Sequence, residues 1–166
     1  CHGNRYRIGR KRRSGKGAVI VIKIFLVEDE IIIREAIHKM IPWEKYGFEF
    51  AGEAKDGEMA LPAIRSIRPD VLITDIKMPF MDGLALSRLV LKELPDTKII
   101  IVSGYDDFEY ARQAISLGVE QYLLKPVTKS AFIEVLEKIR EKYEKEVEQK
   151  DYIEKFQKDI REYEKN

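Results

Sequence analysis

The chain has 166 residues, of which 45% are hydrophobic and 36% charged, with a net charge of +1 and a single cysteine. This length supports one hydrophobic core but not two full domains. One cysteine excludes an intrachain disulfide and suits a reducing cytosol. The longest apolar stretch, residues 18–27, is interrupted by Lys23, which excludes a membrane-spanning helix. We therefore expect a cytoplasmic domain that does not contact a membrane.

The net charge conceals an asymmetry, because residues 1–20 contain seven Lys or Arg and no acid. Such a basic segment is typical of a nucleic-acid arm or a targeting signal. The chain, however, opens with Cys1 rather than Met, and its Gly, Ser and Arg mixture has no helical period. We interpret residues 1–20 as a disordered basic leader that is not native, and expect the natural start near Val21 or Ile22.

Five short apolar runs alternate with stretches of helical spacing. Continuous apolar runs of this kind are typical of parallel strands that are buried on both faces. The alternation predicts an α/β fold with a doubly wound, five-stranded parallel sheet. The expected strands are residues 22–27, 48–54, 71–74, 98–102 and 121–124.

Charged residues follow three of these runs. Glu28 and Asp29 follow the first, Asp75 follows the third and Lys125 follows the fifth. In a sheet of strand order 2-1-3-4-5, the ligand crevice lies between strands 1 and 3. Carboxylates that meet there need a cation, and an oxygen-only set suits Mg²⁺. For each acid alone, a solvated loop residue or a helix N-cap remains the alternative.

The chain contains the motifs Glu28-Asp29, Asp75 with Lys77-Met78-Pro79, Met81-Asp82-Gly83-Leu84, Ser103-Gly104, and Tyr122-Leu123-Leu124-Lys125-Pro126. On these motifs, residues 22–140 resemble the receiver domain of bacterial two-component response regulators, which has this flavodoxin-like topology. Two further segments make the chain most similar to receivers that precede an AraC-type DNA-binding domain: residues 41–47 and 103–111.

The resemblance implies a role for each acid. Asp75 accepts a phosphoryl group from a sensor histidine kinase, and Mg²⁺ is the one cofactor implied. Asp29, Asp75 and the backbone carbonyl of Lys77 ligate this ion directly, whereas Glu28 acts through a bound water. The family more often has aspartate where Glu28 stands, and glutamate is a known variant there that adds one methylene to the side chain.

The resemblance also assigns Ser103 and Lys125 to contacts with the phosphoryl group, and Ser103 and Tyr122 to the switch between two states. It implies a cis peptide bond between Lys125 and Pro126. The sequence alone leaves simpler alternatives open. Ser103-Gly104 is suited to a turn after a strand, Tyr122 to ordinary packing, and Pro126 to the start of a helix.

The C-terminal segment from Lys129 to Asn166 contains no Gly or Pro and is rich in Glu, Lys, Ile, Leu and Tyr. This composition predicts one long helix. We place the receiver domain at residues 21–140 and a helical linker at 141–166, which forms either a coiled coil or a single solvated connector. Apolar residues at helical spacing form two groups: Phe132, Leu136, Ile139 and Tyr143, expected on the sheet, and Ile153, Phe156, Ile160 and Tyr163, in the linker.

The resemblance implies a phosphoacceptor signalling domain that is not an enzyme, beyond self-phosphorylation from small donors and self-dephosphorylation. Phosphorylation is expected to change the face of the fourth helix, fifth strand and fifth helix, to promote a homodimer, and to control a DNA-binding output domain absent from this chain. One rival is a Mg²⁺-dependent phosphohydrolase with an aspartyl nucleophile, but it expects an acid where Lys77 stands. The other is a flavodoxin-like nucleotide or flavin binder, whose phosphate Glu28-Asp29-Glu30 would repel.

Overall fold

The computed structural model describes residues 10–14, 17–104 and 108–165. Within them lie six strands and five α-helices, which alternate after the first two strands, with one 3₁₀ helix, η1, at Trp43–Tyr46. The strands are β1 Arg10–Ser14, β2 Gly17–Val27, β3 Phe48–Ala54, β4 Val71–Thr74, β5 Lys98–Ser103 and β6 Gln121–Leu124. The helices are α1 Ile31–Met40, α2 Gly57–Ile67, α3 Gly83–Glu93, α4 Phe108–Leu117 and α5 Lys129–Glu164.

Five parallel strands form the sheet in the order β3-β2-β4-β5-β6. Since these strands are the five predicted runs in chain order, the predicted order 2-1-3-4-5 is confirmed. The register aligns Val27 with Thr74 and Ser103 with Leu124, so β2 and β4 end level with each other, as do β5 and β6. The residues that follow these four strands therefore meet at one edge of the sheet.

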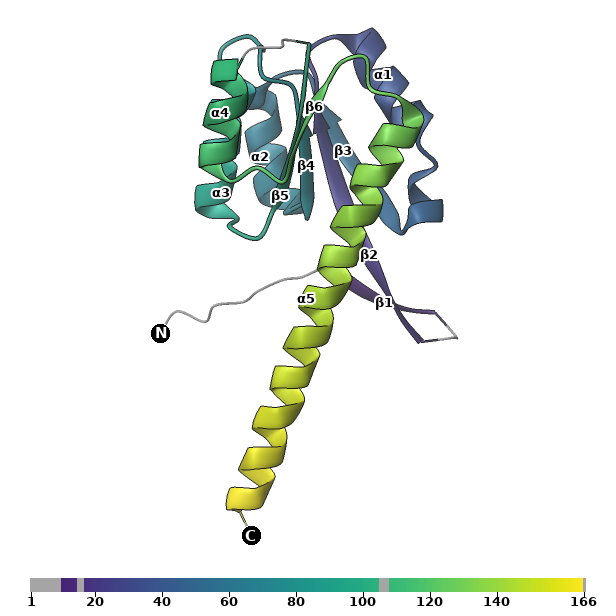
Figure 1. The fold of residues 1–166 in the computed structure, drawn as a ribbon, viewed down its shortest axis with the longest axis vertical. Coiled ribbons are helices and arrows are strands. Elements are labelled where there is room, and N and C mark those ends of the chain that lie inside the picture. Colours follow the sequence, from purple (N-terminus) through teal and green to yellow (C-terminus); the bar gives the residue numbers. More distant parts are fainter. Residues whose placement is uncertain (1–9, 15–16, 105–107, 166) are drawn as a thin grey trace.

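Helices cover both faces of the sheet, with α1 and α5 on one face and α2, α3 and α4 on the other (Figure 1). Successive side chains of β2 divide between the two cores: Ile24 and Leu26 pack with α1 and α5, whereas Phe25 and Val27 pack with the other three helices. Because a strand points alternate side chains to opposite faces, burial on both sides requires an uninterrupted apolar run. This explains why the strands were recognisable in the sequence.

The basic N-terminal segment differs from the expectation of disorder. Arg10–Ser14 forms β1, which pairs antiparallel with residues 17–21, so β2 begins at Gly17 rather than Ile22. The prediction is wrong for residues 10–14 and 17–20, whereas residues 1–9 and 15–16 lie outside the described residues. The physical reason is the β-branched run Val19-Ile20-Val21-Ile22, which favours strand structure and continues β2 upstream.

Helix α5 spans 36 residues and projects far beyond the sheet (Figure 1), which confirms the predicted long helix. Its buried side chains are Phe132, Val135, Leu136, Ile139, Tyr143 and Val147. The core therefore extends past Arg140, where the sequence placed the end of the domain. The second apolar group, from Ile153 to Tyr163, is exposed. No helix in the described part of the chain combines the length and apolar character needed to cross a membrane.

Candidate functional site

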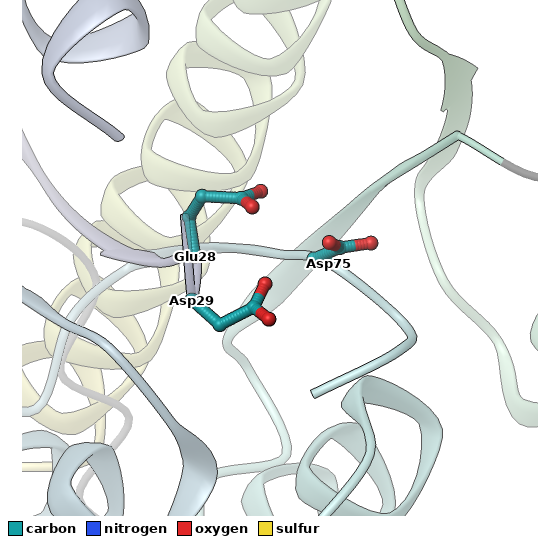
Figure 2. Close-up of side chains that lie close together, drawn as sticks. All are labelled: Glu28, Asp29 and Asp75. Atoms are coloured by element: carbon teal, nitrogen blue, oxygen red, sulfur yellow. The ribbon is translucent and has the colours of Figure 1, made fainter. Parts of the chain in front are cut away.

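Three carboxylates meet where β2 and β4 end. Glu28 and Asp29 follow β2, and Asp75 follows β4. The hydrogen bonding between these two strands continues to Asp75, whose N–H donates to the Val27 carbonyl at 3.1 Å. One carboxylate oxygen from each of the three acids lies within 4.8 Å of the others. Figure 2 shows the three side chains close together at neighbouring strand ends. The predicted convergence of these acids is present in the structure.

The acids differ in their access to solvent. Glu28 and Asp75 are only 1% and 6% exposed, while Asp29 is the most accessible of the three. Several carboxylate oxygens with no sulfur or imidazole among them form a hard donor set, which fits Mg²⁺. The chemistry of the residues present therefore matches the ion that the sequence predicted.

Lys125 brings a positive charge from the end of β6. Its Nζ lies 2.9 Å from Glu28 Oε2 and 3.0 Å from Asp75 Oδ2. Burial acts to lower the pKa of Lys125, but its hydrogen bonds to Glu28 and Asp75 outweigh burial and raise that pKa above its ordinary value. The amine stays charged and offsets part of the repulsion between two buried carboxylates. The peptide bond between Lys125 and Pro126 is cis, as the resemblance implied.

The Glu28 carboxyl group is buried at the end of β2. Burial raises its pKa to about 7; the hydrogen bond from Lys125 opposes this shift, and the charge of Asp75 adds to it. The Glu30 N–H donates to Glu28 Oε1 at 3.4 Å, and the Arg34 guanidinium donates to the Glu28 carbonyl at 2.8 Å. Without a metal ion, Glu28 therefore takes up a proton near neutral pH.

The loop between β4 and α3 holds Asp75 in place. The Ile76 N–H donates to Asp75 Oδ1 at 2.7 Å, and the Gly83 N–H donates to the Ile76 carbonyl at 2.7 Å. A Cβ at Gly83 would lie 1.8 Å from the Asp75 carbonyl oxygen, so only glycine allows this approach. Lys77 lies in this loop with an exposed side chain, whose amine is 5.7 Å from the centre of the Tyr110 ring.

The two predicted switch residues lie on β5 and β6. Ser103 is the last residue of β5 and is fully buried, and its carbonyl accepts the Lys125 N–H at 2.8 Å. Tyr122 is partly buried and packs against the core beneath α2, α3 and α4. Ser103 is thus at the edge of the sheet that carries the acids, while the movement of Tyr122 stays a prediction.

Some supporting contacts had not been predicted. The Thr74 hydroxyl donates to the Asp75 carbonyl at 2.9 Å, and Arg34 reaches the Glu28 carbonyl from α1. Gly83 belongs to the motif Met81-Asp82-Gly83-Leu84, but its close approach to the Asp75 backbone had not been predicted. An Asp-Gly pair before a helix was the available signal for Gly83. Arg34 gave no signal, because only the packing of α1 on the sheet directs it toward Glu28.

Comparison with known proteins identifies the family. The response regulator receiver domain matches residues 24–137, which is more than half of the chain. The chain therefore belongs to the response regulator receiver domain family, and it is a signalling domain of two-component systems. The REC domain of AraT, a response regulator from Geobacillus stearothermophilus, is 44% identical and superposes with a TM-score of 0.73, over 76% of this chain and 98% of that one.

Curated relatives include transcriptional regulators. YesN of Bacillus subtilis (strain 168), described as an uncharacterized transcriptional regulatory protein, is 42% identical over 70% of this chain and 32% of its own length. The transcriptional regulatory protein HptR of Staphylococcus aureus (strain N315) is 44% identical over 64% of this chain and 42% of its own length. The chain thus spans about a third to a half of the length of the curated relatives it matches.

Proposed function

We propose that Asp75 accepts a phosphoryl group from the phosphohistidine of a sensor histidine kinase. The observation that carries this proposal is the position of the Asp75 carboxylate, which lies 3.0 Å from the Lys125 amine and within the three-acid cluster. An Asp75 oxygen forms the new bond to phosphorus while the bond from phosphorus to the imidazole nitrogen breaks. Such transfer depends mainly on positioning and charge neutralisation.

The residues around Asp75 have different roles in this transfer. The Ile76 N–H and the Lys125 amine hold the two carboxylate oxygens, at 2.7 and 3.0 Å. Asp29, Asp75 and the Lys77 carbonyl would hold Mg²⁺, with Glu28 acting through a water. When bound, this ion supplies positive charge to the transferring phosphoryl group. Lys125 and the Ser103 hydroxyl would contact the phosphoryl oxygens after transfer.

Phosphorylation then acts on the face formed by α4, β6 and α5. Phosphorylated Asp75 draws Ser103 inward, and Tyr122 follows. The phosphoryl group shifts the equilibrium between the two states of the domain only through the different contacts that it makes in each state.

Helix geometry supports a homodimer on this face. Ile160 follows Lys142 by about five turns, and Lys142 pairs with Glu120 in the loop between α4 and β6. The exposed apolar group of α5 therefore lies on the side of the helix that faces α4 and β6.

In the full protein this dimer would control a DNA-binding output domain outside this chain, in the cytoplasm. The relatives named as transcriptional regulators, and their greater length, support this part of the proposal. Contact with DNA is assigned to that domain alone, and no membrane partner is proposed.

Mass spectrometry of the intact protein tests the phosphoacceptor. We expect Mg²⁺ and a small phosphodonor to add one labile phosphoryl group, and Asp75→Asn to remove this adduct, since an amide is a far weaker nucleophile. Asp159→Asn, on the exposed part of α5, is the matched control and should retain it. An undiminished adduct in Asp75→Asn would overturn the assignment.

A further inference from the structure

Helix α5 remains packed on the domain well beyond residue 137, where the family match ends. Tyr143 and Val147 are only 2% and 8% exposed, and Tyr143 is among the largest fully buried side chains of the described residues. We call residues 140–147 the α5 anchor. The anchor packs at the edge of the sheet where β4 and β5 begin, which is opposite to the edge that carries Asp75.

The Tyr143 hydroxyl binds two loops at this edge. It donates to the Asp70 carbonyl, just before β4, at 2.7 Å, and lies 3.4 Å from the Asp96 carbonyl in the loop before β5. Burial, together with the negative charge of nearby carboxylates such as Asp70, raises the pKa of Tyr143 far above its ordinary value, so the hydroxyl remains a donor. A buried donor with a buried acceptor is costly to separate.

Lys98, the first residue of β5, contacts two residues of the α5 anchor. Its amine lies 4.3 Å from the centre of the Tyr143 ring and 3.1 Å from Glu146 Oε1. The Lys98 side chain is only 7% exposed. A buried ammonium needs such partners, because an unpaired one would carry a large desolvation penalty. The ring and the carboxylate of α5 thus complete the environment of a charge that belongs to the sheet.

Two polar contacts hold the α5 anchor from either side. The Lys142 amine lies 2.9 and 3.0 Å from the two carboxylate oxygens of Glu120, in the loop before β6. The Arg140 guanidinium donates to the Tyr46 carbonyl of η1 at 3.2 Å. Beyond Val147 the helix changes character, because residues 151–165 are all exposed. Figure 1 shows this part of α5 extending away from the sheet.

We propose that Tyr143, Lys98 and Glu146 fix the direction in which α5 leaves the domain. The α5 anchor is then part of the receiver, and the linker is a rigid extension that begins at Glu148 rather than a helical linker that begins at Glu141. The orientation of any attached domain follows from the sheet, through Lys98 and the loops before β4 and β5. This inference does not depend on phosphorylation of Asp75.

Hydrogen exchange of the whole chain, read by mass spectrometry, tests whether the α5 anchor exists. Amides that open only with the folded core exchange far more slowly than those of a solvated helix. We expect amides of residues 140–147 to exchange at least about tenfold more slowly than those of residues 152–164. Equal exchange in the two segments would overturn the proposal.

Two variants test which residues provide the anchor. Lys98→Met removes the buried charge, and Tyr143→Phe removes the hydroxyl but keeps the ring. Lys138→Met is the matched control, because Lys138 is exposed and pairs within α5, with Glu134. We expect both test variants to speed exchange in residues 140–147 while exchange in β2 and β4 stays slow, and the control to leave both unchanged.

Distances between spin labels then measure the direction of the helix. Labels at Lys92→Cys on α3 and Lys158→Cys on α5, with Cys1→Ser, should give one narrow distance distribution, which broadens in both test variants. If Lys98→Met unfolds the domain, Tyr143→Phe decides the result. An unchanged distribution together with unchanged exchange in the folded test variants would overturn the role of these residues.

Discussion

The amine of Lys125 lies 3.0 Å from the carboxylate of Asp75, although the two residues are 50 positions apart in the chain. The same amine contacts Glu28, which is 97 positions away. We expect Lys125→Met to lower the free energy of unfolding by about 3 kcal/mol at pH 8, because two buried carboxylates lose their counter-charge. Urea titration measures this loss.

Added Mg²⁺ should restore part of that stability in Lys125→Met, since the ion replaces the missing positive charge. Lys138→Met, at an exposed ion pair within α5, is the control and should change the free energy of unfolding by less than about 0.5 kcal/mol. Equal stability of Lys125→Met and the parent without metal would show that the pair is not structurally important.

The second prediction concerns Mg²⁺ affinity. We expect Asp29→Ala to weaken binding by more than about tenfold and Glu28→Ala to weaken it less, because a direct ligand contributes more than a water-mediated one. The structure supports this difference, since the Glu28 carboxylate is already engaged by Lys125, whereas Asp29 is the more accessible acid. Calorimetric titration gives the affinities. Identical values for the parent and both variants would contradict the proposed ligands.

The third prediction concerns pH in the absence of metal. Burial raises the pKa of Glu28 from 4.5 to about 7, so the folded protein holds a proton that the unfolded chain has released over this range. Stability should therefore decrease as pH rises from about 4.5 through 7, by at most about 3 kcal/mol. Urea unfolding at several pH values measures the slope. Glu28→Gln should flatten it, and a slope unchanged in that variant would assign it to other groups.

The fourth prediction separates the α5 anchor from the exposed linker. Truncation after Arg140 removes Tyr143 and Val147 from the core and should cost about 3 to 5 kcal/mol of stability. Truncation after Lys150 keeps both side chains and should leave the free energy of unfolding nearly unchanged. Thermal and urea unfolding of the two lengths provide the comparison. Equal losses would mean that residues 141–147 do not belong to the folded domain.

The fifth prediction concerns dimerisation. A phosphoryl-mimicking metal fluoride should strengthen self-association, and Ile160→Lys should weaken it by placing a charge in the apolar group of α5. Gln157→Lys introduces the same charge at another exposed position of the helix and is the control. Equilibrium sedimentation with and without the fluoride gives the constants. If Ile160→Lys dimerises like the parent in both conditions, the exposed part of α5 serves only as a connector.

The sequence by itself determined the five parallel strands, because strands buried on both faces need continuous apolar runs such as Val71–Thr74. It also placed Glu28, Asp29, Asp75 and Lys125 at one edge, since parallel strands end on the same side. Only the tertiary structure decided which charges pair. Lys125 contacts both Glu28 and Asp75 because the register of β5 with β6 places the Lys125 backbone where its amine can meet both carboxylates. No local sequence pattern encodes the distance between the amine and these carboxylates.

The boundary of the domain was decided in the same way. Tyr143 and Ile153 both occupy apolar positions of one continuous helix, yet Tyr143 is buried and Ile153 is 53% exposed. Spacing along a helix indicates which face is apolar, but not where the surface of the domain that packs against this face ends. That limit is set by the length of the sheet and by Lys98, whose buried amine requires the Tyr143 ring and Glu146 as partners.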